Sequence, residues 1–342
     1  MSTYSQMFPP KPVFTEKDIP ILSGKVFLVT GGYSGVGLEV CRALYHKGGR
    51  VIIAGRSESS YTAAVEEIRG NCGDRLTVDL STPGSLEFLC IDLADLTTIK
   101  PAVEKMLENV KRLDVVWYNA GVMVPPAGSK TKQGYELQWG TNVVGHFLLH
   151  KLLCPLLTAT AAGSEAGTVR AIFVSSIMHT YSPKPYGIDF DSISRDNEKA
   201  SKMAIWNLYS QSKAGDVLLA DEYAKRSVAL APVSNEDPAK KKPHVVSISL
   251  NPGNLKTNLQ RHSTGNKIKE FLVSMILHEQ SLGGLTELYA GLAPETADYN
   301  GGYVVPFGRK GSVVSYVKKG LTSEGTGAKL WEILEEEVKD FA

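Results

Sequence analysis

The sequence predicts an α/β fold with a doubly wound, mostly parallel sheet of seven strands and helices on both faces. Short runs rich in Val and Ile alternate with longer stretches of helical periodicity, and this order builds parallel strands joined by right-handed crossovers. The short runs are apolar throughout instead of alternating with polar residues, as in strands buried on both faces. A chain of 342 residues has room for one large domain of this kind with several additions.

Each predicted element corresponds to one such run or stretch. The strands are expected at 25–29, 50–54, 86–91, 114–118, 171–174, 245–250 and 303–305. The helices between them are expected near 35–48, 58–70, 96–111, 134–159, 203–226 and 281–292. No repeat of the length typical of solenoids or propellers is present, so a single succession of strands and helices is expected.

The overall composition excludes several classes of protein. Lys and Arg number 37 against 36 Asp and Glu, and this net charge of +1 argues against a nucleic-acid partner, which requires a basic surface. The four cysteines form no CxxC pair, which argues against a zinc ribbon and against a thioredoxin-like redox motif. His146 and His150 share one predicted helix with no third ligand near them in the sequence, so no metal site is expected.

The N-terminal region shows no targeting signal. Its first 20 residues contain no apolar run, and nowhere in the chain do about 18 apolar residues follow one another. We therefore expect no signal peptide and no transmembrane segment, and a cytoplasmic protein.

Glycines gather where the first predicted strand meets the first predicted helix. The segment reads Thr30-Gly31-Gly32-Tyr33-Ser34-Gly35-Val36-Gly37. In doubly wound sheets ligands bind at such turns, and a helix N-terminus offers N–H groups and positive dipole character to a pyrophosphate. Glycine allows the backbone to approach a ligand closely. A tight turn without any ligand remains the alternative.

Five further motifs follow in order along the chain. They are Tyr118-Asn119-Ala120-Gly121, Asn142 with Gly145 and His146, Val174-Ser175-Ser176, Tyr209 with Lys213, and Asn251-Pro252-Gly253 with Thr257. With the glycine motif, which has the form TGxxxGxG, the chain resembles the short-chain dehydrogenase/reductase family over roughly 25–305. That resemblance implies a Rossmann-type fold. The N-terminal arm and the C-terminal tail resemble those of retinol-dehydrogenase-like reductases, including members from fungal metabolism.

The resemblance implies a catalytic set of Ser176, Tyr209, Lys213 and Asn142. Tyr209 and Lys213 are four residues apart, so they share one face of a helix. A neighbouring ammonium group is expected to lower the pKa of the tyrosine. Asn142 would connect Lys213 to a water relay. Since side chains alternate along a strand, Ser175 is expected to be structural and Ser176 to bind the substrate oxygen.

The end of the second predicted strand suggests the cofactor. Arg56 and Ser57 follow it with no preceding carboxylate, and an arginine at this place accommodates a 2′-phosphate, so NADP(H) is expected. A solvated arginine that caps the loop is the alternative. The resemblance implies further cofactor contacts from Gly31, Tyr33, Ser34, Gly35, Val36, Gly37, Asp92, Leu93, Asn119, Ala120, Gly121, Tyr209, Lys213, Pro252, Gly253, Leu255 and Thr257. As an alternative to its cofactor contact, Asp92 could cap the next helix, although Asp95 is better placed for that role.

The sequence says less about the substrate than about the cofactor. The loops at 123–126 and 259–276 are largely apolar, which fits a hydrophobic carbonyl compound or alcohol. Met123, His179, Tyr181 and Trp206 are candidates to line the pocket, and each could equally be a packing or surface residue.

These expectations combine into one function and its alternatives. We expect an NADPH-dependent oxidoreductase that reduces a hydrophobic ketone or aldehyde to an alcohol, or runs the reverse reaction, with Tyr209 exchanging the proton. The alternatives are a non-catalytic nucleotide sensor, or an enzyme in which the cofactor assists an isomerisation, imine reduction or cyclisation.

The expected organisation is an arm at 1–22, one NADP-binding catalytic domain at 23–310, and a tail with a helix at 311–342. Insertions are expected near 71–85, 180–202 and 228–243. The second insertion lengthens the distance from Ser176 to Tyr209 to 33 residues, and should cover the active site or the Tyr209 helix. It leaves open whether the protein is a monomer or a homo-oligomer.

Overall fold

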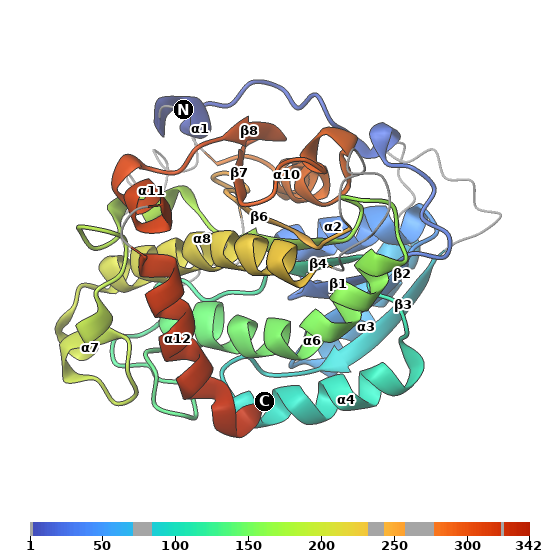
Figure 1. Ribbon diagram of the computed structural model, residues 1–342. Coiled ribbons are helices and arrows are strands. Elements are labelled where there is room, and N and C mark those ends of the chain that lie inside the picture. The colour runs from blue at the N-terminus through green and yellow to red at the C-terminus, as the bar shows by residue number, and fades with distance from the viewer. Residues whose placement is uncertain (1–2, 71–83, 232–242, 257–276, 323–324) are drawn as a thin grey trace.

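The computed structural model describes residues 3–70, 84–231, 243–256, 277–322 and 325–342. One twisted sheet runs through its centre in the order β3-β2-β1-β4-β5-β6-β7-β8 (Figure 1). Its strands are β1 Val26–Thr30, β2 Arg50–Gly55, β3 Ser85–Cys90, β4 Val115–Tyr118, β5 Arg170–Val174, β6 Val246–Leu250, β7 Gly302–Val305 and β8 Arg309–Gly311. The first seven strands pair in parallel, which confirms the predicted doubly wound class.

The predicted count of seven strands was one too low. β8 pairs antiparallel with β7, with Val304 opposite Lys310. Its sequence, Arg309-Lys310-Gly311, contains no apolar run because it is an edge strand exposed to solvent on one side. A search for buried strands by apolar composition therefore passes over it.

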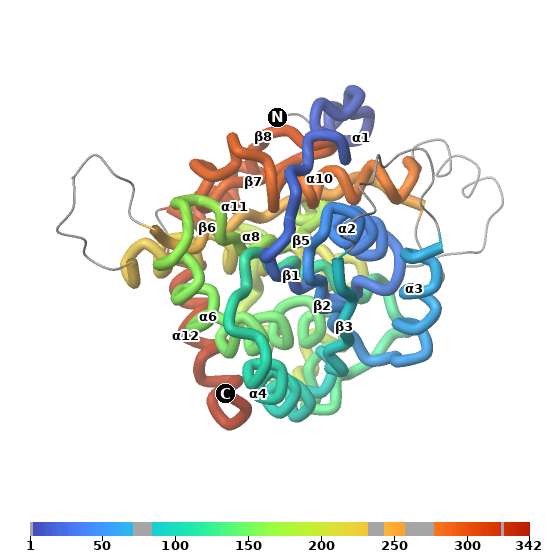
Figure 2. The backbone as a smooth tube through the Cα atoms, turned by 90° about the vertical axis from the view of Figure 1, so that its right-hand side faces the viewer, coloured from blue at the N-terminus to red at the C-terminus, as the bar shows by residue number. Residues whose placement is uncertain are grey.

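Helices cover both faces of the sheet (Figures 1 and 2). On one face lie α2 Gly35–His46, α3 Glu58–Gly70 and α10 Gln280–Leu292, and on the other lie α4 Ile99–Asn109, α6 Gly145–Ala162 and α8 Ile205–Leu230. Consecutive strand residues point into opposite layers: Leu28 belongs to the core beneath α6 and α8, and Val29 to the core beneath α2 and α10. Both layers are dry and apolar, which explains the uninterrupted hydrophobic runs of the strands.

The helix predicted near 134–159 has three parts. It comprises α5 Leu137–Trp139, a π-helical segment Gly140–Val144 and α6. The continuous stretch Leu137–Ala162 is the one helix of the described residues that is long and apolar enough to cross a membrane by length and composition. Since 61% of that window is buried inside the protein, it has the character of a core helix.

Short elements complete the chain. The arm contains α1 Thr3–Met7 and η1 Glu16–Asp18, and the C-terminal region contains α11 Ser315–Thr322, α12 Thr326–Val338 and η8 Lys339–Phe341. Further turns are η2 Leu96–Thr98, η4 Ile177–Tyr181, η5 Phe190–Ser192, α7 Glu198–Lys202 and η7 Pro294–Thr296. Most of the insertions predicted near 71–85 and 228–243 lies outside the described residues, as does the loop at 259–276.

The segment predicted as an insertion at 180–202 lies against α8. Gln211 of α8 accepts a hydrogen bond from the backbone N–H of Asp189 at 2.8 Å and donates one to the hydroxyl of Ser192 at 3.0 Å. The segment therefore covers the outer face of the helix that carries Tyr209.

Candidate functional site

The turn after β1 is built around glycines in positions that disfavour a side chain. Gly31 donates its N–H to the carbonyl of Ala54 at 2.7 Å with φ +67°, and Gly35 has φ +59°, both in the left-handed region that disfavours side chains. A Cβ on Gly37 would lie 2.5 Å from the Nδ2 atom of Asn119. The turn thus packs directly against the turn after β4.

The N-terminus of α2 opens from this turn. Ser34 precedes the helix, and its side chain makes no capping hydrogen bond to the first turn. The first-turn N–H groups of a helix have no partner within the helix, so they are available to an anion. A glycine-lined turn that ends in an uncapped helix N-terminus fits the pyrophosphate of a dinucleotide.

The end of β2 carries Arg56. This side chain is exposed and forms no ion pair with any of the described residues. Beside it, the ring of Tyr33 covers Gly55, where a Cβ would lie 2.2 Å from the ring. The hydroxyl of Ser57 accepts the N–H of Ser60 at 3.2 Å, so Ser57 caps α3. Because it has no ion-pair partner among the described residues, the guanidinium group of Arg56 is available to bind a phosphate at this edge of the sheet.

The carboxylates after β3 have separate partners. Asp95 accepts the N–H of Thr97 at 3.1 Å and caps η2, as expected. Asp92 accepts the N–H of Ala94 at 2.9 Å. The side chain of Leu93 is buried in the core beneath α4 and α6. A cofactor could therefore contact the backbone of Leu93 but not its side chain.

Asn142 lies in the π-helical segment and joins two parts of the site. Its Oδ1 atom accepts the N–H of Val122 at 2.9 Å, and its Nδ2 atom donates to the carbonyl of Val122 at 3.1 Å and to the hydroxyl of Ser212 at 3.0 Å. A Cβ on Gly121 would lie 3.1 Å from Asn142 Oδ1 and 3.8 Å from Lys213 Nζ. The turn after β4, Asn142 and Lys213 therefore converge.

His146 holds Asn142 in place and is itself held by Thr30; neither residue was predicted to belong to the site. His146 donates from Nδ1 to the carbonyl of Asn142 at 3.0 Å, and its Nε2 atom lies 3.0 Å from the hydroxyl of Thr30 at the end of β1. Burial lowers the pKa of His146 to about 3, so the ring is neutral. One lone pair of the Asn142 backbone carbonyl is therefore occupied by His146.

The two serines at the end of β5 have different roles. Ser175 is buried and donates to the carbonyl of Lys213 at 2.6 Å, which anchors α8 to the strand. The hydroxyl of Ser176 accepts the N–H of Met178 at 3.2 Å, and its interaction with Tyr209 acts to lower the pKa of that phenol. The alternation expected for consecutive strand residues is thus present.

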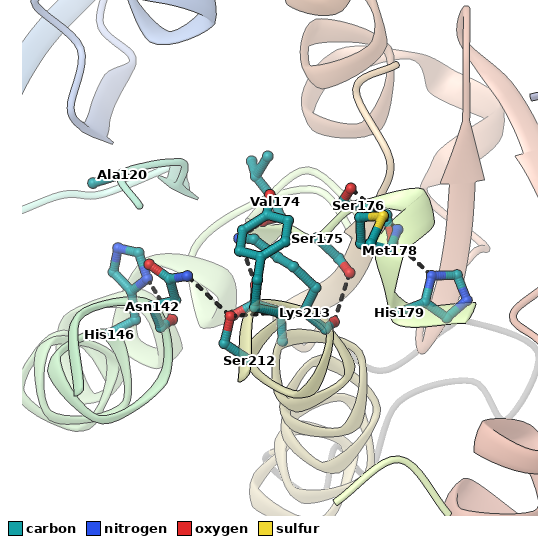
Figure 3. A network of polar contacts seen from close by, with 12 residues as sticks. Ala120, Asn142, His146, Val174, Ser175, Ser176, Met178, His179, Ser212 and Lys213 are labelled. Carbon is teal, nitrogen blue, oxygen red and sulfur yellow. Dashed lines mark hydrogen bonds and ion pairs between the residues drawn. The ribbon is translucent and has the colours of Figure 1, made fainter. Parts of the chain in front are cut away.

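Tyr209 and Lys213 lie on the buried face of α8 (Figure 3 shows Lys213 with Ser212 and Asn142). Lys213 Nζ donates to the carbonyl of Val174 at 2.8 Å and to Oδ2 of Asp216 at 2.9 Å. It lies 5.9 Å from the centroid of the Tyr209 ring.

Burial has the largest effect on the pKa of Tyr209 and raises it. Lys213 and the Ser176 hydroxyl act to lower that pKa, as expected of the ammonium, but they do not offset the rise. In this structure Tyr209 is therefore a protonated phenol.

The candidates for a substrate pocket separate into two groups. His179 is fully buried: its Nδ1 atom donates to the carbonyl of Ser176 at 2.7 Å, and its Nε2 atom accepts the N–H of Val314 at 3.4 Å. It holds the backbone of Ser176 in place. Tyr181 and Trp206 are exposed, and Trp206 packs edge-on against Tyr209 with centroids 6.4 Å apart. Met123 is partly buried after the β4 turn.

The loop after β6 is held by the N-terminal arm. Asn251 donates to the side-chain oxygen of Gln6 at 3.0 Å and accepts the N–H of Gly253 at 3.1 Å. Gly253 has φ +112°, and Pro252 and Leu255 flank it. Thr257 lies outside the described residues. Nothing in the sequence motif indicated that Gln6 would reach this loop.

A parallel doubly wound sheet, a glycine turn at a helix N-terminus, and a buried tyrosine–lysine pair at the same edge define a dinucleotide-binding α/β enzyme. Among the described residues no group of three His, Cys, Asp or Glu side chains could hold a metal ion.

Comparison with known proteins agrees with this class. Residues 25–185 match the family model of the short chain dehydrogenases. A short-chain dehydrogenase/reductase of Armillaria gallica is 38% identical over 342 residues, covering 99% of this chain and 98% of that protein. The chain belongs to the short-chain dehydrogenase/reductase family, and it is an oxidoreductase that uses a nicotinamide cofactor.

Solved structures show the same fold. A protein of Mycobacterium paratuberculosis superposes with a TM-score of 0.65 at 25% identity, over 95% of this chain and 97% of that one. The 3-ketoacyl-(acyl-carrier-protein) reductase of Brucella melitensis, complexed with NADH, superposes with a TM-score of 0.56 at 18% identity, over 84% and 98% of the two chains.

Proposed function

We propose that the protein is an NADPH-dependent reductase that converts a hydrophobic ketone or aldehyde to an alcohol. The observation that carries this proposal is the buried pair of Tyr209 and Lys213 beside the partly buried Ser176 at one edge of the sheet, with Tyr209 held as a protonated phenol. A reduction needs a proton donor at neutral pH, and Tyr209 is in that state.

The residues would divide the reaction among them. When bound, the reduced nicotinamide supplies a hydride to the carbonyl carbon and is itself oxidised. Ser176 orients the carbonyl oxygen by a hydrogen bond. As the C=O double bond becomes a single bond, Tyr209 gives its phenolic proton to that oxygen, and the resulting phenolate is stabilised by the ammonium of Lys213.

The preference for NADPH is supported by Arg56. A guanidinium group pairs well with a phosphate dianion because it offers a planar fork of donors. Arg56 follows β2, where the adenosine ribose is bound in this fold, and it has no carboxylate partner among the described residues.

The class of substrate follows from the surroundings of the site. Trp206 packs edge-on against Tyr209, Met123 follows the turn after β4, and Tyr181 ends the short helix that begins after Ser176. These side chains suit a lipophilic carbonyl compound, as in retinol-dehydrogenase-like reductases, and offer no cation for an acidic substrate.

The proposal is tested by following NADPH oxidation with a panel of lipophilic ketones and aldehydes. We expect turnover with at least one of them, and its loss in Tyr209→Phe with NADPH binding retained. A variant that turns over as fast as the parent would refute the role of Tyr209. A product of unchanged redox state would favour the cofactor-assisted isomerisation or cyclisation instead.

A further inference from the structure

Asp216 lies one helical turn after Lys213 on α8, and the two side chains form an ion pair. Lys213 Nζ and Asp216 Oδ2 are 2.9 Å apart, and both side chains are almost fully buried, with 7% and 4% of their surfaces exposed. A buried ion pair needs close to ideal geometry to offset its desolvation. Its presence beside Tyr209 therefore calls for an explanation beyond packing.

The pair fixes the direction of the lysine ammonium. An ammonium group has three N–H donors, and here one reaches the carbonyl of Val174 at 2.8 Å and a second reaches Asp216. Two acceptors on different elements prevent rotation about the terminal bond. The third N–H is thereby directed, and it is the donor that remains for a ligand or for the Tyr209 oxygen.

The other titratable groups around Lys213 are neutral near pH 7. His146, on the neighbouring helix, has its pKa lowered to about 3 by burial, and burial lowers that of His179 in η4 to about 4. Burial raises the pKa of Glu287 on α10 to about 8. Burial also raises the pKa of Asp216, although only to about 6, so Asp216 is the anion of this group.

We propose that Asp216 is a positioning residue that fixes the Lys213 ammonium and, through its negative charge, keeps Tyr209 protonated up to a higher pH than Lys213 alone would allow. The pair has no net charge, so the phenolate faces a compensated cation instead of a free one. In line with this, Asp216 acts to raise the pKa of Tyr209, whereas Lys213 acts to lower it.

This role rests on the proposed function, because it concerns the proton donor of a carbonyl reduction. Its consequence is a wider pH range for reduction. With Asp216 ionised, the proton donor is retained into alkaline solution; without that charge, Tyr209 would ionise earlier and the rate of reduction would fall at lower pH.

The test that does not depend on turnover is ultraviolet difference titration of the phenolate in the NADP⁺-bound protein, with Tyr209→Phe as the reference. We expect the Tyr209 titration to move to lower pH by about one unit in Asp216→Asn. Asn keeps the shape and one acceptor but removes the charge. Asp216→Ser removes the charge at smaller volume and replaces Asn if that variant does not fold.

A matched control lies on the same helix. Asp221 pairs with Lys225 at 2.6 Å, so Asp221→Asn removes a paired carboxylate from α8 without touching Lys213, and should leave the titration unchanged. A Tyr209 titration in Asp216→Asn that coincides with the parent, or moves to higher pH, overturns the inference.

The second measurement is the pH profile of kcat/KM for reduction. We expect its alkaline limb to move down by the same amount in Asp216→Asn and to stay in place in Asp216→Glu, which keeps the charge. If no carbonyl compound is reduced by the parent protein, the proposed function fails, and the titration still decides the role of Asp216.

Discussion

Two halves of the site are built on different principles. The half around β1 and β2 is made of backbone: positive-φ glycines at 31 and 35, no room for a Cβ at Gly37, and an uncapped helix N-terminus. The half around β5 and α8 is made of titratable and hydroxyl side chains in a dry environment. The first should respond to changes of shape and little to pH, and the second should respond to charge and burial.

After Tyr209, whose replacement by Phe should abolish turnover, the largest effect is expected in the side-chain half at Ser176. Replacing it by Ala removes the hydroxyl that would orient the carbonyl oxygen, so we expect kcat to fall about a hundredfold, the usual effect of losing one such donor. The measurement is steady-state reduction at saturating NADPH. The dissociation constant of NADPH should not change. A weaker affinity for NADPH with a normal kcat would contradict this prediction, because Ser176 would then serve cofactor binding and not the reaction.

In the backbone half, Gly37→Ala should act on binding alone. The new Cβ would lie 2.5 Å from Asn119 Nδ2 and 2.8 Å from the carbonyl oxygen of Gly31, so the turn must open, and we expect affinity for NADPH to drop by at least about tenfold. Fluorescence titration measures it. The control is Gly70→Ala at the end of α3, where a Cβ meets nothing within 4 Å in the described part of the chain; equal losses in both variants would contradict the account.

Glu287 offers a prediction on stability and pH. It is fully buried, neither carboxyl oxygen has a hydrogen-bond partner among the described residues, and burial raises its pKa from 4.5 to about 8. A raised folded-state pKa means that this group's contribution to stability is complete below pH 4.5 and is lost as the pH rises through about 8.

At pH 5, Glu287→Gln should therefore unfold at nearly the same temperature as the parent protein. At pH 8.5 it should be more stable than the parent by about 2 kcal/mol. Thermal denaturation at the two pH values measures this difference. The same gain at both pH values would show that the carboxyl group is not the cause.

The smallest effect is expected at Arg56. Arg56→Ala should weaken NADPH binding by about tenfold, the value of one charge-assisted contact, and leave NADH binding unchanged. Fluorescence titration of both cofactors gives the ratio. Equal affinities of the parent protein for NADPH and NADH would refute the proposed cofactor preference.

The backbone half of the site was the easier one to predict from the sequence. A glycine turn between a buried strand and a helix leaves a local pattern, and the sheet class follows from the apolar runs, as the structure confirms. β8 was missed because its three residues are polar and pair only across a turn. Its position depends on the antiparallel pairing with β7, which no local pattern records.

The side-chain half was only partly predictable, because its properties arise from contacts that are distant in sequence. Tyr209 and Lys213 were predicted from the family resemblance together with their spacing, but the sign of the Tyr209 pKa shift depends on burial that only the packed structure shows. For His179 the sequence left a pocket residue and a packing residue as equal alternatives, and the structure shows it buried and hydrogen-bonded to the carbonyl of Ser176. Asp216 could have been noticed, since an acid at i+3 from a lysine on an apolar helix face is costly without that partner.

The most direct test of the proposed reduction is isotopic. The protein is incubated with NADPH that carries deuterium at the transferable position of the nicotinamide, together with a lipophilic ketone that it turns over. The account predicts an alcohol with one deuterium on the carbinol carbon and a hydroxyl proton from solvent, and no such product with Tyr209→Phe. A product without deuterium would contradict it.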